Sequence, residues 1–299
     1  MHKPIDYLKF LMVNVPMLPY FEVRAAIAIA FTAVATYYDL ANNKNVPSIL
    51  LYAFVAIGVL FNLVTLTGEP VYAFAIPLAV FAMGFLFYRS GLFGSADAYT
   101  FTAISLLIPY ADKQAYSLGT PYPFILSVIT ATTFLFGIAM LAKFIPYIVN
   151  RIKKGGLKLS NERKLSTALM AIALVLLVYT ISRIPFLAGG QLVLMAFVIV
   201  MVLFFTIFRD EVMGSFVGEI AISKVENEDV LAIEKMDPET VKKFKLQPYV
   251  DETMMKRLKD SGLATVPVYT KLPAFEPYIL IGLVISLFAG DVFFFLAGL

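Results

Sequence analysis

The chain has 299 residues, of which 60% are hydrophobic and 15% are charged, and its net charge at neutral pH is +3. A soluble fold of this size cannot bury so much apolar surface, so the composition indicates a membrane protein. The basic residues form short clusters between apolar runs, a pattern that does not indicate nucleic-acid binding. There is no cysteine, and the only histidine is His2. Thiolate chemistry and triads that need histidine are therefore excluded, and a hydrolase built from this sequence must work with carboxyl groups.

Residues 1–24 carry charges and prolines and are expected to form a surface lead-in. Eight apolar runs follow, each expected to be a transmembrane helix, in an all-α polytopic architecture. The runs are 25–38, 46–66, 70–88, 98–110, 121–149, 165–182, 187–208 and 277–298. The first and fourth runs are short, and they become long enough to cross a bilayer only if their polar flanks join the helices. Those flanks contain Asp39 and Asp97.

The orientation of the spans follows from the connection at 150–164, which carries six lysine and arginine residues. By the positive-inside rule this connection is expected to be cytoplasmic. Counting back along the spans places the connections at 39–45 and 89–97 on the same side. Asp39 and Asp97 are then expected at the same depth, near the cytoplasmic face of the cell membrane.

The long polar segment 209–276 is expected to be a small cytoplasmic α/β module. A strand is predicted over 216–222 and another over 264–270. Asp237 followed by Pro238 is typical of a helix start, and Asp251 is expected to begin a second helix that Gly262 ends. Residues 277–299 then form the last transmembrane helix.

Asp39 and Asp97 are the acids that this pattern singles out. A carboxyl group in or beside a membrane helix is costly to bury, and two at matching depth suit a shared site. Position alone leaves a second interpretation open, because a solvated acid at a helix end is common. Next to Asp97, the small residues Gly94, Ser95 and Ala96 permit close backbone approach by a substrate or a neighbouring helix.

Tyr37-Tyr38-Asp39 followed by Val46-Pro47, together with the run from Gly91 to Asp97, resembles the prepilin peptidase family. In that family the first aspartate precedes a hydrophobic-Pro pair, and the second closes a Gly-x-Gly-Asp motif. The resemblance covers roughly residues 25–110 and extends through the leucine-rich segment 101–109. Ala96 stands where the motif has its second glycine, Tyr99 stands where a lysine is expected, and Ser48 replaces the usual asparagine. The absence of a cysteine-rich segment favours the archaeal, preflagellin peptidase branch.

The resemblance implies an intramembrane aspartyl protease with Asp39 and Asp97 as its catalytic pair and with Gly94, Ser95, Ala96 and Pro47 in support. Two close carboxyl groups share one proton, so one activates water while the other protonates the scissile carbonyl. No metal or other cofactor is then needed. The implied partners are preflagellin or pilin-like precursors with short basic leaders, in the lipid bilayer, with no nucleic acid. The catalytic membrane core would be 25–110, with further transmembrane helices over 111–208.

Two other interpretations remain. A presenilin or signal-peptide-peptidase-type protease is suggested by Tyr38-Asp39 and by Pro273-Ala274-Phe275, which approximates a Pro-Ala-Leu motif. Two spans separate the aspartates here, whereas that family carries them on consecutive spans. An ion-coupled transporter could also use paired acids, although no inverted repeat is evident. Asp291, in the last run, is expected to lie too far from the pair to join it.

Overall fold

The computed structural model describes residues 18–41, 46–66, 70–89, 94–110, 123–154, 161–182, 189–226, 229–269 and 273–290. The described chain is mostly helical, with one small two-stranded sheet. Four helices are long and apolar enough to cross a membrane, which indicates a multi-pass membrane protein. These helices are 21–41, 48–65, 71–89 and 124–153.

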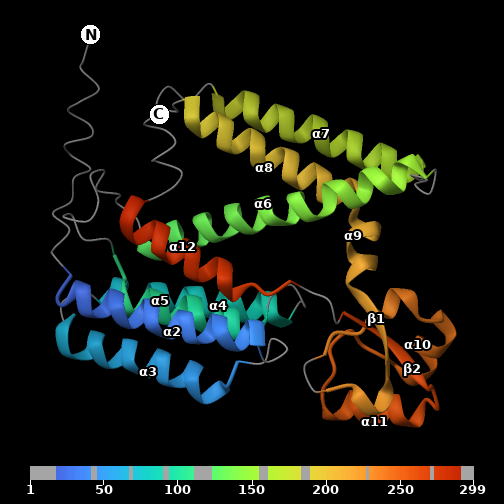
Figure 1. Ribbon diagram of the computed structural model, residues 1–299, viewed down its shortest axis with the longest axis horizontal. Coiled ribbons are helices and arrows are strands. Elements are labelled where there is room, and N and C mark those ends of the chain that lie inside the picture. The colour runs from blue at the N-terminus through green and yellow to red at the C-terminus, as the bar shows by residue number, and fades with distance from the viewer. Residues whose placement is uncertain are drawn as a thin grey trace.

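Four helices near the start of the chain form a bundle around α5 (Figure 1). They are α2 (Phe21–Ala41), α3 (Ser48–Thr65), α4 (Ile76–Arg89), which continues a π-helical turn η1 (Val71–Ala75), and α5 (Ser95–Leu107). Most residues of α5 are buried because α2, α3 and α4 all pack against it. As predicted, the helices extend through the polar flanks and include Asp39 and Asp97. The expected end of α5 at residue 110 is wrong, since the helix ends at Leu107, two residues before Pro109.

The last described helix, α12 (Glu276–Ala289), packs between α2 and the long helix α6 (Phe124–Lys153). A side chain at Gly282 would place a Cβ only 2.3 Å from Thr132 Oγ1 of α6, so the close approach of the two helices needs glycine there. Helix α12 thus packs against the four-helix bundle from the far end of the sequence. Asp291 lies outside the described residues.

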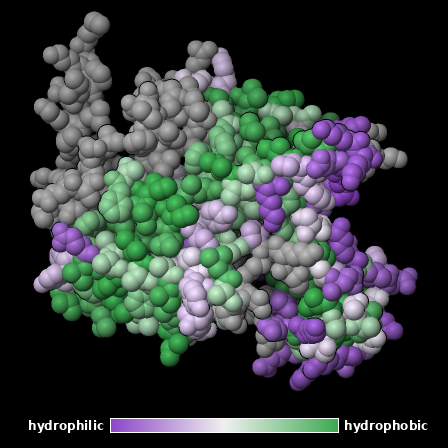
Figure 2. All heavy atoms as spheres, viewed as in Figure 1, coloured by the Kyte–Doolittle hydropathy of each residue, from purple (hydrophilic) through white to green (hydrophobic). Residues whose placement is uncertain are grey.

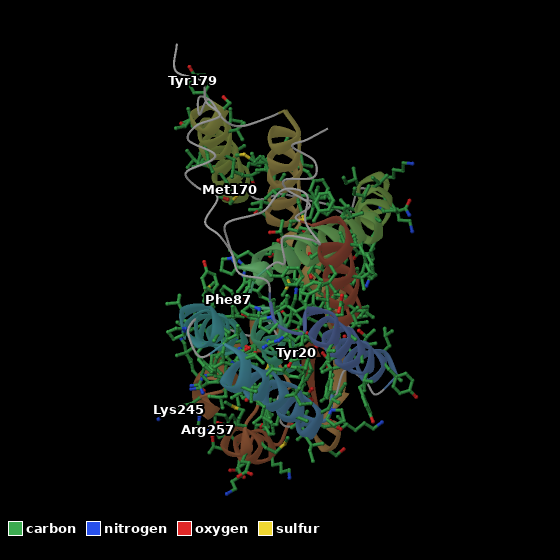
Figure 3. The ribbon with its side chains drawn as sticks, turned by 90° about the vertical axis from the view of Figure 1, so that its left-hand side faces the viewer. Tyr20, Phe87, Met170, Tyr179, Lys245 and Arg257 are labelled. Atoms are coloured by element: carbon green, nitrogen blue, oxygen red, sulfur yellow. The ribbon has the colours of Figure 1, made fainter. Side chains whose placement is uncertain are left out.

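Helix α6 has 30 residues and is about 45 Å long, so it extends well beyond α12 (Figure 1). Its far end leads to a hairpin of α7 (Asn161–Ser182) and α8 (Gly189–Ile207). Met170 and Tyr179 of α7 lie in a layer separate from the bundle that holds Tyr20 and Phe87 (Figure 3). Within the hairpin, the Thr206 hydroxyl of α8 lies 3.6 Å from Met170 Sδ.

Helix α9 (Arg209–Phe216) connects the hairpin to a small α/β module. Strand β1 (Val217–Ala221) pairs antiparallel with β2 (Thr265–Tyr269), with Val217 opposite Tyr269. Two short 3₁₀ turns, η2 (Ile222–Lys224) and η3 (Ile233–Lys235), follow β1. Both predicted strands are confirmed. The expected start at Phe216 is wrong, because Phe216 ends α9 and is buried against Phe144 of α6.

The two module helices begin at the predicted caps. Asp237 accepts a hydrogen bond from Thr240 N–H at the start of α10 (Pro238–Phe244). Asp251 does the same for Met254 N–H at the start of α11 (Glu252–Asp260), and Gly262 follows with a φ of 69°. Hydrophilic residues gather on the module and on the neighbouring end of α6 and α7, while the helical body is largely hydrophobic (Figure 2).

The tyrosine pair Tyr88 and Tyr249 joins the module to the bundle. Tyr88 lies in the last turn of α4, and its hydroxyl forms a hydrogen bond with the hydroxyl of Tyr249 in the module. The two rings meet edge to face at 5.6 Å between centroids. The module therefore sits against the end of the bundle at which α4 finishes and α5 begins.

Arg24 anchors the opposite end of the bundle. Its side chain is completely buried, and Nη1 donates to Asn62 Oδ1 and to the carbonyl of Leu107, each at 2.9 Å. Nη2 donates to Thr65 Oγ1 at 2.6 Å. The acceptors lie in the last turns of α3 and α5, where helix carbonyls have no partner within their own helix. Arg24 therefore joins the ends of three helices with hydrogen bonds.

Candidate active site

Asp39 lies in the last turn of α2 and is only 7% exposed. Its Oδ2 accepts a hydrogen bond of 3.1 Å from the backbone N–H of Glu276, the first residue of α12. The N–H groups of a helix's first turn have no partner within the helix and favour negative charge. Asp39 therefore meets the positive end of α12, although it belongs to the negative end of α2.

Asp97 is the third residue of α5 and is 8% exposed. Its Oδ2 accepts a hydrogen bond of 3.0 Å from the backbone N–H of Gly94, the residue that caps the helix. A Cβ at Gly94 would lie 3.0 Å from that same oxygen, so a small residue is needed where the carboxylate folds back. The two residues between them, Ser95 and Ala96, are half-buried in the first turn of α5.

Ala96, Tyr99 and Pro47 serve the packing around the aspartates. Ala96 and Tyr99 pack against the buried cluster of Ala35, Val46 and Leu51. The Tyr99 ring lies between α3 and α4, with Tyr52 and Phe81 each at 5.5 Å between centroids. Pro47 caps α3, and its carbonyl accepts from Leu50 N–H at 3.0 Å. These residues hold the first turns of α3 and α5 together next to the acids.

The structure brings Asp39 and Asp97 to one place, where the charge of Asp39 acts on the Asp97 carboxyl group. The end of α2 and the start of α5 meet there, with the start of α12 beside them. The two aspartates are 58 residues apart in sequence, so only the packing of α2 against α5 joins them. Two neighbouring carboxyl groups whose charges interact cannot both ionise cheaply, so one of them tends to keep a proton.

Glu276 is a third buried acid in this place, and the sequence analysis missed it. It is 1% exposed, and its Oε1 accepts a hydrogen bond of 2.7 Å from the Thr100 hydroxyl of α5. Both aspartates act electrostatically on its carboxyl group. A glutamate followed by proline at the start of a helix is ordinary, because it complements the helix dipole. The one available signal was that this acid directly precedes an apolar run.

Thr36 and Glu276 each contribute a buried side-chain oxygen that has no hydrogen-bond partner. Thr36 lies one turn before Asp39 on the buried face of α2, and the second oxygen is Glu276 Oε2. Buried polar atoms nearly always have partners, so such exceptions call for an explanation such as a bound water or a reactive role. Among the described residues, no group of three possible metal ligands is placed to hold a metal ion.

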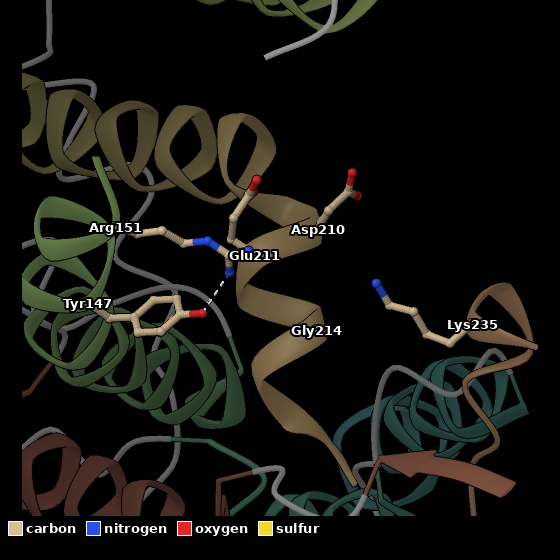
Figure 4. Close-up of a pocket in the computed structure, with 6 residues that line it drawn as sticks. All are labelled: Tyr147, Arg151, Asp210, Glu211, Gly214 and Lys235. Carbon is tan, nitrogen blue, oxygen red and sulfur yellow. Dashed lines mark hydrogen bonds between the residues drawn. The ribbon is translucent and has the colours of Figure 1, made fainter. Parts of the chain in front are cut away.

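A separate polar pocket of about 300 Å³ lies at the far end of α6 (Figure 4). It is lined by Tyr147, Arg151, Asp210, Glu211, Gly214 and Lys235. Arg151 donates to the Tyr147 hydroxyl at 2.9 Å. The start of α12 packs against α6 at Phe136, and Arg151 lies 15 residues, or about 22 Å, further along that helix. The pocket is therefore distinct from the carboxyl cluster.

Comparison with known proteins identifies no relative: no family model, no curated protein and no solved structure matches the chain.

Proposed function

We propose that the chain is a membrane-embedded aspartyl endopeptidase of the prepilin peptidase type. The observation that supports this most directly is the meeting of Asp39 and Asp97. Both are buried, both are held by a backbone N–H at a helix start, and they come from helices separated by α3 and α4. Acids placed only for solvation at a helix end would be exposed to solvent.

The chemistry requires no more than the pair and water. One ionised carboxylate takes a proton from the water, whose oxygen attacks the carbonyl carbon, while the other carboxyl group gives its proton to the carbonyl oxygen. The first carboxyl group then gives the proton that it took from water to the departing amine, and a hydroxyl proton of the tetrahedral carbon passes to the second carboxylate. The C–N bond breaks and the pair returns to its starting state. Each peptide bond consumes one water molecule.

The proposed topology places this pair at the cytoplasmic face. Besides the four long apolar helices, α5, α7, α8 and α12 would complete eight spans, and the basic end of α6 would face the cytoplasm together with the module. The substrates would be preflagellin or pilin-like precursors, cut between a short basic leader and the hydrophobic helix that follows it. Such a leader would meet the site from the side on which the module lies.

A presenilin-type intramembrane protease is the second candidate, and one contact favours it. Pro273-Ala274-Phe275, which approximates the motif of that family, leads directly into Glu276, whose N–H contacts Asp39. The two candidates differ in substrate. A presenilin-type enzyme would cut within a transmembrane helix and would not need a basic leader.

The test is cleavage of a leader-bearing precursor by the full chain reconstituted in liposomes. We expect Asp39→Asn and Asp97→Asn each to lower the cleavage rate at least about 100-fold, the usual size of a general acid or base contribution. Asp260→Asn is the matched control, because Asp260 is an exposed acid of α11 outside the site. The same liposomes report cation flux.

Cleavage by the wild type and loss in both site variants would support the proposal. Cleavage retained in either variant would contradict the assignment of that aspartate. Cutting inside the transmembrane helix of the precursor would favour the presenilin type. Asp-dependent cation flux without cleavage would favour an ion-coupled transporter.

A further inference from the structure

Glu276 is a buried acid that the two-aspartate mechanism does not use. Its backbone N–H holds Asp39 of α2, and its side chain accepts from Thr100 of α5. One residue therefore connects α12 to both helices that carry the aspartates. If α12 were needed only for packing, an apolar residue at this position would avoid burying a carboxyl group.

The second side-chain oxygen of Glu276 indicates what the group does. Oε2 is fully buried and has no hydrogen-bond partner. A buried carboxylate with an unpartnered oxygen is strongly disfavoured, whereas a proton shared with a neighbouring carboxyl group would remove the charge and supply a partner.

The groups that face Glu276 are few. Among the described residues, the titratable groups whose charges act on Glu276 are Asp97 of α5 and Asp39 of α2. On the side of α6, the Phe136 ring lies 5.0 Å from Phe275 and 5.3 Å from Tyr278, so that side is aromatic. Within the described part of the chain, the two aspartates are therefore the acids with which Glu276 can exchange a proton.

We propose that Glu276 is the third carboxyl group of the cluster: its side chain shares the cluster's protons with Asp39 and Asp97, while its backbone N–H orients Asp39. This inference rests on the proposed peptidase function, in which Glu276 is a positioning residue that does not touch the peptide. Protons held on Glu276 are exchanged within the cluster only, so each turnover still consumes one water molecule.

Glu276→Gln tests the inference, because glutamine keeps an oxygen for the Thr100 hydroxyl and keeps the backbone N–H but cannot titrate. We expect kcat to fall about 10-fold with KM unchanged. The basic limb of the pH profile should move to lower pH by about one unit, since the last shared proton is lost more easily without a third negative charge nearby. Thr100→Val, which removes the hydroxyl that holds Oε1, should also change the pH profile.

Ser286→Ala is the matched control on the same helix, a buried polar residue that lies more than two turns away from Glu276. It should leave the pH profile unchanged. A Glu276→Gln variant that is correctly inserted and has the kcat and pH profile of the wild type would overturn the inference while leaving the peptidase proposal intact.

Infrared spectroscopy separates this inference from the function. The carbonyl stretch of protonated, buried carboxyl groups is recorded against pH for the full chain in liposomes, with no substrate. We expect the wild type to show one more titrating buried carboxyl group than Glu276→Gln, and the remaining titration to move to lower pH in the variant. If the aspartate titration is the same with and without Glu276, the inference is wrong, whether or not the chain cleaves a precursor.

Discussion

The two ends of the helical bundle bury charged groups in opposite ways. At one end, Arg24 is buried with both terminal nitrogens bonded to the ends of α3 and α5, and Phe61 lies 5.0 Å below its guanidinium. At the other end, Asp39, Asp97 and Glu276 gather where two helices begin and one ends, and a buried oxygen of Glu276 has no partner. The two terminal nitrogens of Arg24 are matched by acceptors, although its Nε has no partner among the described residues. The second end instead gathers three acids, whose charges have the same sign.

This difference distinguishes a polar network that fixes helices from a cluster of acids for which we propose a reaction. Helix carbonyls at a C-terminal end need donors, and a buried arginine supplies several at once, so the Arg24 network satisfies the backbone and fixes the helices. The acids oppose one another. Asp39 and Asp97 each accept a hydrogen bond from a backbone N–H, and Glu276 accepts one from a hydroxyl. Local rules are most often broken at functional sites, and for this reason we propose the acidic end as the active site.

Replacing Arg24 should give the largest loss of stability. In Arg24→Met the acceptors of Asn62, Leu107 and Thr65 lose their donor, and we expect the free energy of unfolding to fall by about 3 kcal/mol or more. Unfolding in mixed micelles measures this. Arg257→Met is the control, because Arg257 donates to the Lys245 carbonyl at an exposed site and should change stability by less than about 0.5 kcal/mol. Equal stability of the two variants would contradict the anchoring role of Arg24.

A shift of α12 away from α6 should have the second-largest effect, and it should act on the acidic end of the bundle. In Gly282→Ala the new Cβ would lie 2.3 Å from Thr132 Oγ1 and 2.9 Å from its backbone N, so α12 must shift away from α6. We expect a loss of about 1–3 kcal/mol in stability, and slower cleavage because the Glu276 N–H moves relative to Asp39. Gly214→Ala is the matched control, since its Cβ meets only Lys235 Nζ at 3.8 Å. Wild-type cleavage by Gly282→Ala would show that the position of α12 does not matter to the site.

Separating the module from the bundle should have a smaller effect. Tyr88→Phe and Tyr249→Phe each remove one hydroxyl of the pair that joins them, and we expect each to cost about 1 kcal/mol. A double-mutant cycle on stability tests the pair directly, because the second substitution should then cost little. Tyr20→Phe, which changes a hydroxyl that is 66% exposed, is the control. Additive effects of the two substitutions would contradict a direct bond.

The smallest effect should come from the helix caps of the module. Hydrogen bonds from the Thr253 hydroxyl and the Met254 N–H lower the pKa of Asp251 below its ordinary value. The Asp251 carboxylate therefore contributes its full stabilisation when the pH is above its ordinary, unfolded-state pKa. This stabilisation is lost as the pH falls through the lowered pKa of the folded state. We expect Asp251→Ala to weaken the module slightly at neutral pH and not at all in strong acid, as measured by the unfolding of α11. If the wild type and Asp251→Ala still differ in stability in strong acid, the charged helix cap is not the cause of the difference.

Much of the local structure could be predicted because its causes are local. Asp237 and Asp251 begin helices through bonds to residues three positions away, and both strands of the module show in their apolar content. The extension of α2 and α5 through Asp39 and Asp97 followed from the length that a membrane span requires. The exact ends of helices and strands were harder to predict from the sequence. Phe216 ends a helix because its ring packs on Phe144, a contact 72 residues away in sequence.

The sequence by itself determined that the chain is mostly helical with several apolar spans, where the two capped helices of the module begin, and which two aspartates form a candidate pair. Apolar composition and helix capping depend on residues that are close in sequence, so both can be read from the sequence alone. Only the tertiary structure decided that α12 crosses between α2 and α6 and that its first N–H contacts Asp39. It also decided that Arg24 and Glu276, which look like ordinary helix-start residues, are buried at opposite ends of one bundle. The physical reason is that burial and hydrogen bonding between distant helices depend on how they pack, and one missing side chain at Gly282 sets that packing.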